Sequence, residues 1–95
     1  MIMKGMAVVR VYATGACPYC HRAEMLLRSK GITPEIIRVD GDPMQRQAMQ
    51  KLASGRHTVP QIFINGRHVG GYDDIAALDR RGALDPLLQD GGQKG

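Results

Sequence analysis

Two cysteines lie close together in the string Cys17-Pro18-Tyr19-Cys20. Such a pair can carry out thiol–disulfide exchange, bind zinc or attach haem. The string follows a short apolar run and precedes residues with helical spacing, which places it at a strand-to-helix junction. The N–H groups of the first helical turn would stabilise a thiolate at Cys17, and Cys20 would lie close enough to attack it. The pattern therefore favours thiol–disulfide exchange.

The metal alternatives need ligands that the sequence does not supply at the right spacing. A zinc site needs two more ligands, but His21 directly follows Cys20, and His57 and His68 are not a pair at ligand spacing. The string also fits the C-x-x-C-H pattern of haem attachment, which Pro18 and the expected helix start disfavour. We therefore expect no metal.

Two further segments could hold a substrate beside the cysteines. Thr58-Val59-Pro60 precedes an expected strand. Pro60 could simply open an edge strand, whereas a cis bond there would turn the Val59 N–H and C=O toward an extended peptide. The segment Gly70-Gly71-Tyr72-Asp73-Asp74 leads into a helix whose N-terminus could bind a carboxylate. Asp73 or Asp74 would cap that helix or accept a hydrogen bond from an ammonium group, so the segment suits the α-amino-acid end of a ligand.

The elements that position these segments follow from apolar periodicity and turn residues. We expect strands over residues 7–12, 35–39, 61–64 and 67–70, with Asn65-Gly66 as a hairpin turn between the last two. Helices are expected from 18 to 30, from 44 to 53, from Asp73 or Asp74 to Leu78, and after Gly82. This order predicts an α/β, thioredoxin-like fold, a mixed four-stranded sheet with helices on both faces.

Composition sets the remaining limits. We expect the 95 residues to form one domain over 1–95, with flexible ends at 1–6 and 90–95. A hydrophobic fraction of 43% excludes a disordered chain. The net charge of +4 is scattered, and few aromatic residues accompany it, so nucleic acid is not an expected partner. Without a recognisable signal peptide or membrane span, and with a single close cysteine pair, we expect a cytoplasmic protein that does not bind membranes.

These motifs together resemble those of bacterial dithiol glutaredoxins of the glutaredoxin-3 type, over about residues 8–88. The resemblance rests on the combination and spacing of four strings, which are Cys17-Pro18-Tyr19-Cys20-His21-Arg22-Ala23, Thr58-Val59-Pro60-Gln61-Ile62-Phe63-Ile64, Gly70-Gly71 with Asp73-Asp74, and Leu84-Asp85-Pro86-Leu87-Leu88.

The resemblance implies an oxidoreductase that uses glutathione as co-substrate to reduce protein disulfides and glutathionylated proteins. Cys17 would be the nucleophile and Cys20 the resolving thiol. The residues that match positions lining the glutathione groove are Tyr19, Thr58, Val59, Pro60, Gly71, Tyr72, Asp73 and Asp74. In such proteins Pro60 would be cis, the Val59 backbone would pair with the cysteine of glutathione, and residues 72–74 would hold its γ-glutamyl end. Electrons would come from NADPH through glutathione reductase, and the protein would be a monomer.

Two departures from the family pattern bear on the groove. Many members carry a lysine three residues before the first cysteine, where this chain has Thr14. We expect Arg46 or Gln47 on the second helix to supply part of that contact with glutathione. Tyr72 also stands where relatives often have a cysteine.

Two alternatives remain open. A carrier reduced by a thioredoxin-type reductase would usually have Trp beside the cysteine motif, and this chain has no Trp. A glutaredoxin that holds a [2Fe–2S] cluster between two subunits usually has Gly after the first cysteine, where this chain has Pro18.

Overall fold

A computed structural model describes residues 7–89. Strands and helices follow one another in the order expected from the sequence. Their bounds are β1 (Val9–Ala13), α1 (Pro18–Ser29), β2 (Glu35–Arg38), α2 (Pro43–Leu52), β3 (Gln61–Ile64), β4 (Arg67–Gly70), α3 (Tyr72–Arg80) and α4 (Leu84–Leu88).

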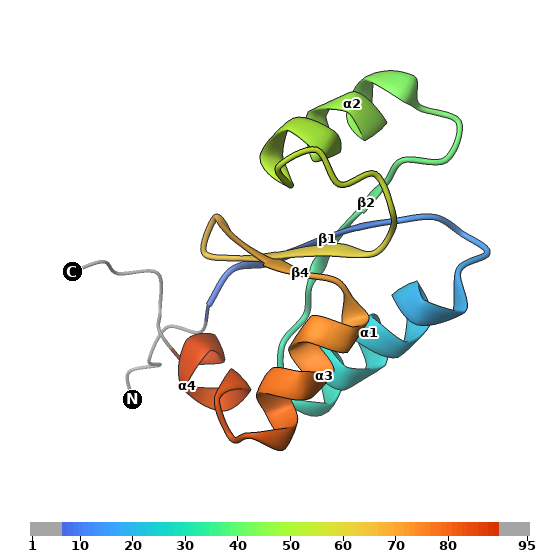
Figure 1. Ribbon diagram of the computed structural model, residues 1–95. Coiled ribbons are helices and arrows are strands. Elements are labelled where there is room, and N and C mark those ends of the chain that lie inside the picture. Colours follow the sequence, from blue (N-terminus) through green and yellow to red (C-terminus); the bar gives the residue numbers. More distant parts are fainter. Residues whose placement is uncertain (1–6, 90–95) are drawn as a thin grey trace.

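The four strands form one sheet in the order β2-β1-β3-β4. The pair β1–β2 is parallel, as a β-α-β connection requires, whereas β1–β3 and β3–β4 are antiparallel. Helix α2 covers one face of the sheet, and α1, α3 and α4 lie on the other (Figure 1). The predicted mixed sheet with helices on both faces is therefore confirmed.

The hairpin bounds match the prediction because its turn chemistry is specific. Asn65 and Gly66 both have positive φ, 52° and 82°, as a two-residue hairpin turn demands. The first strand begins at Val9 rather than at residue 7, because the Val8 N–H is bonded to the Asn65 side chain instead of to a neighbouring strand. The second strand ends at Arg38 rather than at residue 39.

Each face of the sheet packs against its own group of buried side chains. Alternation along β1 sends Val9 and Val11 to the α1–α3 face and Tyr12 to the α2 face. On the first face the fully buried side chains include Leu27, Ile62 and Ile75. The smaller core beneath α2 consists of Tyr12, Val39, Met49, Ala53 and Phe63. One packing layer thus fixes α1 and α3 against the sheet, and the other fixes α2.

The predicted single domain over 1–95 stays a prediction, and its two flexible ends, 1–6 and 90–95, lie outside the described residues. Within residues 7–89, the structure contains no helix that is long and apolar enough to span a membrane.

The core beneath α1 predicts the cost of a cavity. Leu27 is completely buried, so Leu27→Ala should lower the free energy of unfolding by about 2–5 kcal/mol. Met25 lies on the same helix but is 67% exposed, and Met25→Ala should change it by less than about 0.5 kcal/mol. Urea denaturation of both variants measures the difference. Equal losses would contradict the packing described here.

Candidate active site

The first turn of α1 is capped by a sulfur atom. Cys17 is the N-cap residue, with extended backbone angles, and Pro18 follows at the first helical position. The Cys17 Sγ accepts a hydrogen bond from the Cys20 backbone N–H at 3.2 Å. The first N–H groups of a helix have no partner within the helix, and they favour a negative charge. The sequence therefore places Cys17 where a thiolate gains a hydrogen bond and a favourable helix end.

The second cysteine has a different environment. Cys20 is only 6% exposed, whereas Cys17 is partly buried, and both are free thiols. Burial, followed by the hydrogen bond to Cys17, raises the pKa of the Cys20 thiol to about 12. Cys20 is consequently protonated at neutral pH and does not compete with Cys17 as a nucleophile.

The connection between α2 and β3 brings a second backbone segment to Cys17. The Val59–Pro60 peptide bond is cis, as the resemblance implied. The Val59 carbonyl oxygen lies 3.9 Å from the Cys17 Sγ, close enough to accept a hydrogen bond from the thiol. Residues distant in the sequence therefore place a sulfur atom directly beside the backbone of Val59, which is partly exposed.

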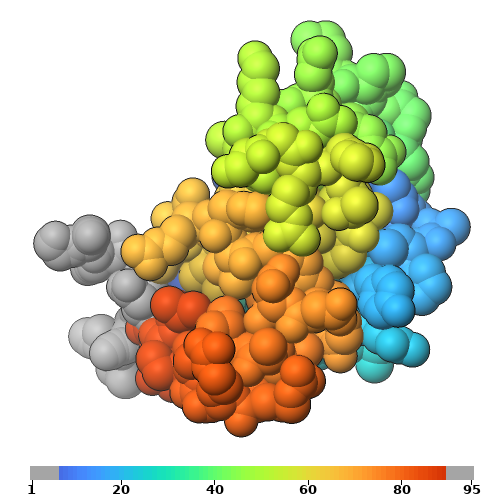
Figure 2. Space-filling model, in the orientation of Figure 1, coloured from blue at the N-terminus to red at the C-terminus, as the bar shows by residue number. Residues whose placement is uncertain are grey.

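A hollow of about 150 Å³ opens beside this contact. Its lining consists of Tyr19, Arg56, Thr58, Val59, Pro60, Gly71, Tyr72, Asp73 and Asp74. Figure 2 shows the face on which the yellow-green connection after α2 lies above the orange α3. The structure therefore gathers eight of the nine groove residues named from the sequence around one hollow.

Arg46, the ninth, lies elsewhere. It lines a separate hollow on α2 with Pro43, Met44, Gln47 and Gln50, and its guanidinium donates to the His57 carbonyl oxygen at 3.5 Å. Its contact with glutathione stays a prediction.

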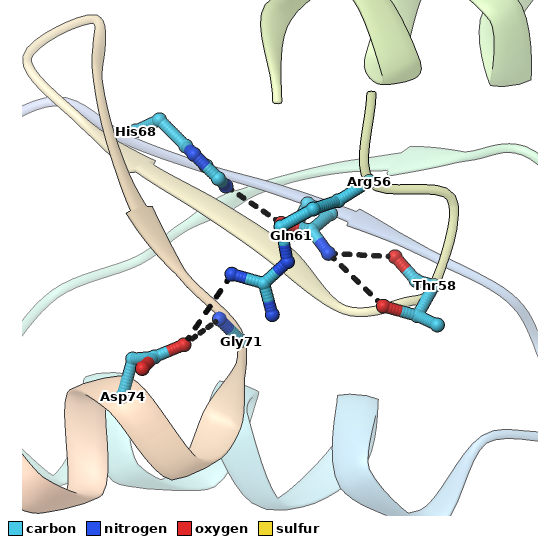
Figure 3. A network of polar contacts seen from close by, with 6 residues as sticks. All are labelled: Arg56, Thr58, Gln61, His68, Gly71 and Asp74. Atoms are coloured by element: carbon cyan, nitrogen blue, oxygen red, sulfur yellow. Dashed lines mark hydrogen bonds and ion pairs between the residues drawn. The ribbon is translucent and has the colours of Figure 1, made fainter. Parts of the chain in front are cut away.

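Arg56 lines the hollow beside Cys17 and was missed from the sequence. Its Nη1 lies 3.7 Å from the Asp74 Oδ2, so the side chain reaches from the α2–β3 connection toward the start of α3 (Figure 3). A basic residue shortly before Thr58-Val59-Pro60 was the available signal, but one cation in a loop is indistinguishable in sequence from an ordinary solvated side chain.

The start of α3 differs from the prediction that Asp73 or Asp74 caps it. The N-cap residue is Gly71, and the Asp74 Oδ2 accepts a hydrogen bond from the Gly71 N–H at 2.8 Å. A carboxylate at the third helical position can reach back to the N-cap N–H, which is why Asp74 lies inside the helix. Gly70 has a φ of +128°, and a Cβ atom there would collide with the Asp74 carboxylate. The two glycines thus allow α3 to begin directly at the hollow.

An aromatic pair forms one rim of the hollow. The rings of Tyr19 and Tyr72 stack with centroids 6.2 Å apart and planes inclined by 29°. The Arg22 guanidinium lies 5.5 Å from the centroid of the Tyr19 ring. Tyr19 from α1 and Tyr72 from α3 therefore close the side of the hollow nearest the cysteine motif.

No cluster of three or more His, Cys, Asp or Glu side chains that could hold a metal ion occurs within the described chain. The arrangement offers the chemistry of two free thiols. A thioredoxin-like sheet with a sulfur-capped helix, a buried second thiol and a cis proline beside it defines a thiol–disulfide oxidoreductase.

Comparison with known proteins identifies the family. Residues 9–69 match the glutaredoxin family model. The chain is 55% identical over 84 residues to glutaredoxin 3 of Escherichia coli K12, covering 88% of this chain and 100% of that protein. The chain therefore belongs to the glutaredoxin family, and it is a glutathione-dependent thiol–disulfide oxidoreductase.

Two solved structures are similar in fold. The holo form of glutaredoxin C1 from Populus tremula × tremuloides has a TM-score of 0.81 and 34% identity, covering 97% of this chain and 85% of that one. A complex of buckwheat glutaredoxin with glutathione has a TM-score of 0.79 and 32% identity, covering 94% of this chain and 83% of that one.

The contrast between the cysteines can be tested by alkylation. Iodoacetamide at pH 7 should modify Cys17 in the reduced protein and leave Cys20 intact, because Cys20 is buried and protonated. Peptide mass spectrometry locates the label, and Cys17→Ser shows how slowly Cys20 reacts alone. Comparable labelling of both cysteines would contradict the proposed division of roles.

Proposed function

We propose that Cys17 is the nucleophile of this glutaredoxin and that Cys20 is its resolving thiol. The observation that carries the proposal is the position of the Cys17 Sγ, which lies between the Cys20 N–H and the carbonyl of Val59, a residue that lines the hollow. An attacking thiolate needs a partially exposed sulfur with a favourable electrostatic environment, and Cys17 has both. Cys20 is buried, and its pKa is raised to about 12.

With a glutathionylated protein, the Cys17 thiolate attacks the glutathione sulfur. The Cys17–glutathione disulfide forms, the original disulfide breaks, and the protein thiolate leaves and takes up a proton. A second glutathione thiolate then attacks the sulfur of the bound glutathione. Glutathione disulfide leaves, and the Cys17 thiolate is restored. NADPH reduces glutathione disulfide through glutathione reductase, so this cycle needs only Cys17.

With a protein disulfide, Cys17 attacks one sulfur and remains joined to the protein. Cys20 loses its proton and attacks the Cys17 sulfur, which releases the reduced protein and forms the Cys17–Cys20 disulfide. Two glutathione molecules then reduce this disulfide and leave as glutathione disulfide. The high pKa of Cys20 keeps it from attacking first, and formation of the mixed disulfide removes the Cys17 group to which it is bonded.

The hollow would hold glutathione along two backbone segments. Val59 would pair with its cysteine residue, since an extended peptide can bond to both the N–H and the C=O of one residue. The γ-glutamyl carboxylate would lie at the start of α3, whose N–H groups favour an anion, with Asp73 and Asp74 near the ammonium group. Thr58 and Tyr19 would complete the lining.

The protein would act as a monomer in the cytoplasm. Its partners would be protein disulfides, glutathionylated proteins and, indirectly, glutathione reductase.

The cluster-carrying alternative makes a separate prediction, because a [2Fe–2S] protein would be a coloured dimer. A colourless monomer after anaerobic purification with glutathione present would exclude the cluster-carrying alternative.

The roles of the cysteines predict a simple pattern of activity. In an assay that couples reduction of a small glutathione mixed disulfide to NADPH consumption, Cys17→Ser should fall to the background rate. Cys20→Ser should keep most of the activity, because that cycle needs one thiol. With a protein disulfide as substrate, both variants should be inactive.

Activity of Cys17→Ser on the mixed disulfide would overturn the assignment of the nucleophile. Wild-type protein that is inactive with glutathione but reduced by a thioredoxin reductase would support the rival carrier instead.

Arg56 and Arg46 allow a matched test of how the anionic tripeptide is held. Arg56→Gln should raise the KM for glutathione about two- to fivefold with a smaller change in kcat, because Arg56 lines the hollow but is half exposed. Arg46→Gln removes the same charge from a different hollow, so a smaller effect is expected. Steady-state kinetics compares the two. If only Arg46→Gln raises the KM, then Arg46 supplies the contact, as the sequence suggested.

A further inference from the structure

Gln61 is a buried polar residue at the start of a buried strand. Its relative exposure is 0%, and in the described part of the chain it is the single polar residue classed as buried. It begins β3, whose other residues, Ile62, Phe63 and Ile64, are buried and apolar. Burying an amide costs free energy unless its polar atoms are bonded, so a Gln at this position needs bonds that a hydrocarbon side chain would not.

The Gln61 amide is fully engaged, and its partners are specific. Its Nε2 donates to the Thr58 carbonyl oxygen at 2.9 Å and to the Thr58 Oγ1 at 3.2 Å. Its Oε1 lies 2.6 Å from the His68 Nε2 on β4. Figure 3 shows Gln61 between Thr58 and His68. One side chain therefore connects the second strand of the hairpin to the loop that precedes Pro60.

The bonds at both ends of the amide determine which atoms donate. The Thr58 carbonyl can only accept, so the Gln61 NH₂ group must face it, and the Gln61 oxygen must face His68. His68 then has to donate from Nε2. Burial, together with the nearby Arg56 guanidinium, holds the pKa of His68 below its usual range, with Asp74 opposing them, which favours a neutral ring. His68 also packs against Phe63, with ring centroids 5.0 Å apart, so its ring has little freedom to turn.

Fixing the Thr58 carbonyl also fixes the Val59 N–H. The two groups belong to one planar peptide unit and point in opposite directions across it. Since Gln61 holds the carbonyl on the core side, the N–H is directed away from the core. Within residues 7–89 the Val59 N–H makes no hydrogen bond to the protein, although Val59 is only partly exposed. The Thr58 hydroxyl, as an acceptor from Gln61, keeps its own proton for another partner.

We infer that Gln61 is a positioning residue for glutathione: with its amide held between Thr58 and His68, it aims the Val59 N–H and the Thr58 hydroxyl at the bound tripeptide. The inference rests on the proposed glutathione groove, because the Val59 N–H and the Thr58 hydroxyl can bind glutathione only if the tripeptide lies in that groove. Gln61 touches neither the substrate nor the cysteines. It acts only through the peptide unit that it holds.

The test measures how strongly the groove favours glutathione over a disulfide partner without a peptide. In Cys20→Ser protein, redox buffers give the equilibrium constants for joining glutathione and for joining 2-mercaptoethanol to Cys17. The ratio of the two equilibrium constants reports the contacts that the groove makes with the peptide. A change in the reactivity of Cys17 affects both constants equally and cancels in the ratio. The variants are Gln61→Met, which removes all three hydrogen bonds, and His68→Phe, which keeps a ring against Phe63. His57→Phe is the matched control at an exposed neighbouring histidine.

Gln61→Met should lower the ratio about tenfold, the equivalent of one well-formed hydrogen bond, and His68→Phe by a smaller factor, with His57→Phe unchanged. If Gln61→Met lowers only the melting temperature and keeps the parent ratio, Gln61 is structural and the inference fails. If the parent protein itself shows no preference for glutathione, the proposed groove fails first. If Gln61→Met does not fold, the His68→Phe variant provides the test. An unchanged ratio in His68→Phe would overturn the role given to His68.

Discussion

The unpaired N–H groups at the start of α1 are the constraint on which the site depends. A helix leaves these groups without partners, and here one of them is bonded to the sulfur of Cys17 instead of to a serine or aspartate oxygen. The requirement for a cap and the requirement for a stabilised thiolate are thus met by the same atom. Cys20 follows in the same turn, and its burial against the core separates the chemistry of the two thiols.

The sheet supplies the second half of the site. Strand β1 lies between β2 and β3, so the loop that leaves β1 toward Cys17 meets the loop that enters β3 through Val59. The start of α3 meets them because β4 pairs with β3 and ends at Gly70. Side chains from α1, from the α2–β3 connection and from the start of α3 therefore surround one hollow.

Much of this could be predicted from the sequence because its signals are local. The Asn65-Gly66 turn fixed the hairpin, and the position of Pro18 indicated where α1 begins. Contacts across the fold were harder to predict. The side chain of Arg56 reaches the hollow only because the loop after α2 folds back toward α3, and no periodicity reports that. Gln61 looks like an ordinary polar residue in a strand until its burial and its three bonds are known.

Val59 is proposed to present its backbone to a glutathione attached to Cys17. The most direct test records the Val59 amide signal by ¹H–¹⁵N NMR in Cys20→Ser protein, with either glutathione or 2-mercaptoethanol joined to Cys17. Only glutathione should move the amide proton downfield and slow its exchange with water, because only the tripeptide can accept its hydrogen bond. The same shift and exchange rate in both adducts would contradict it.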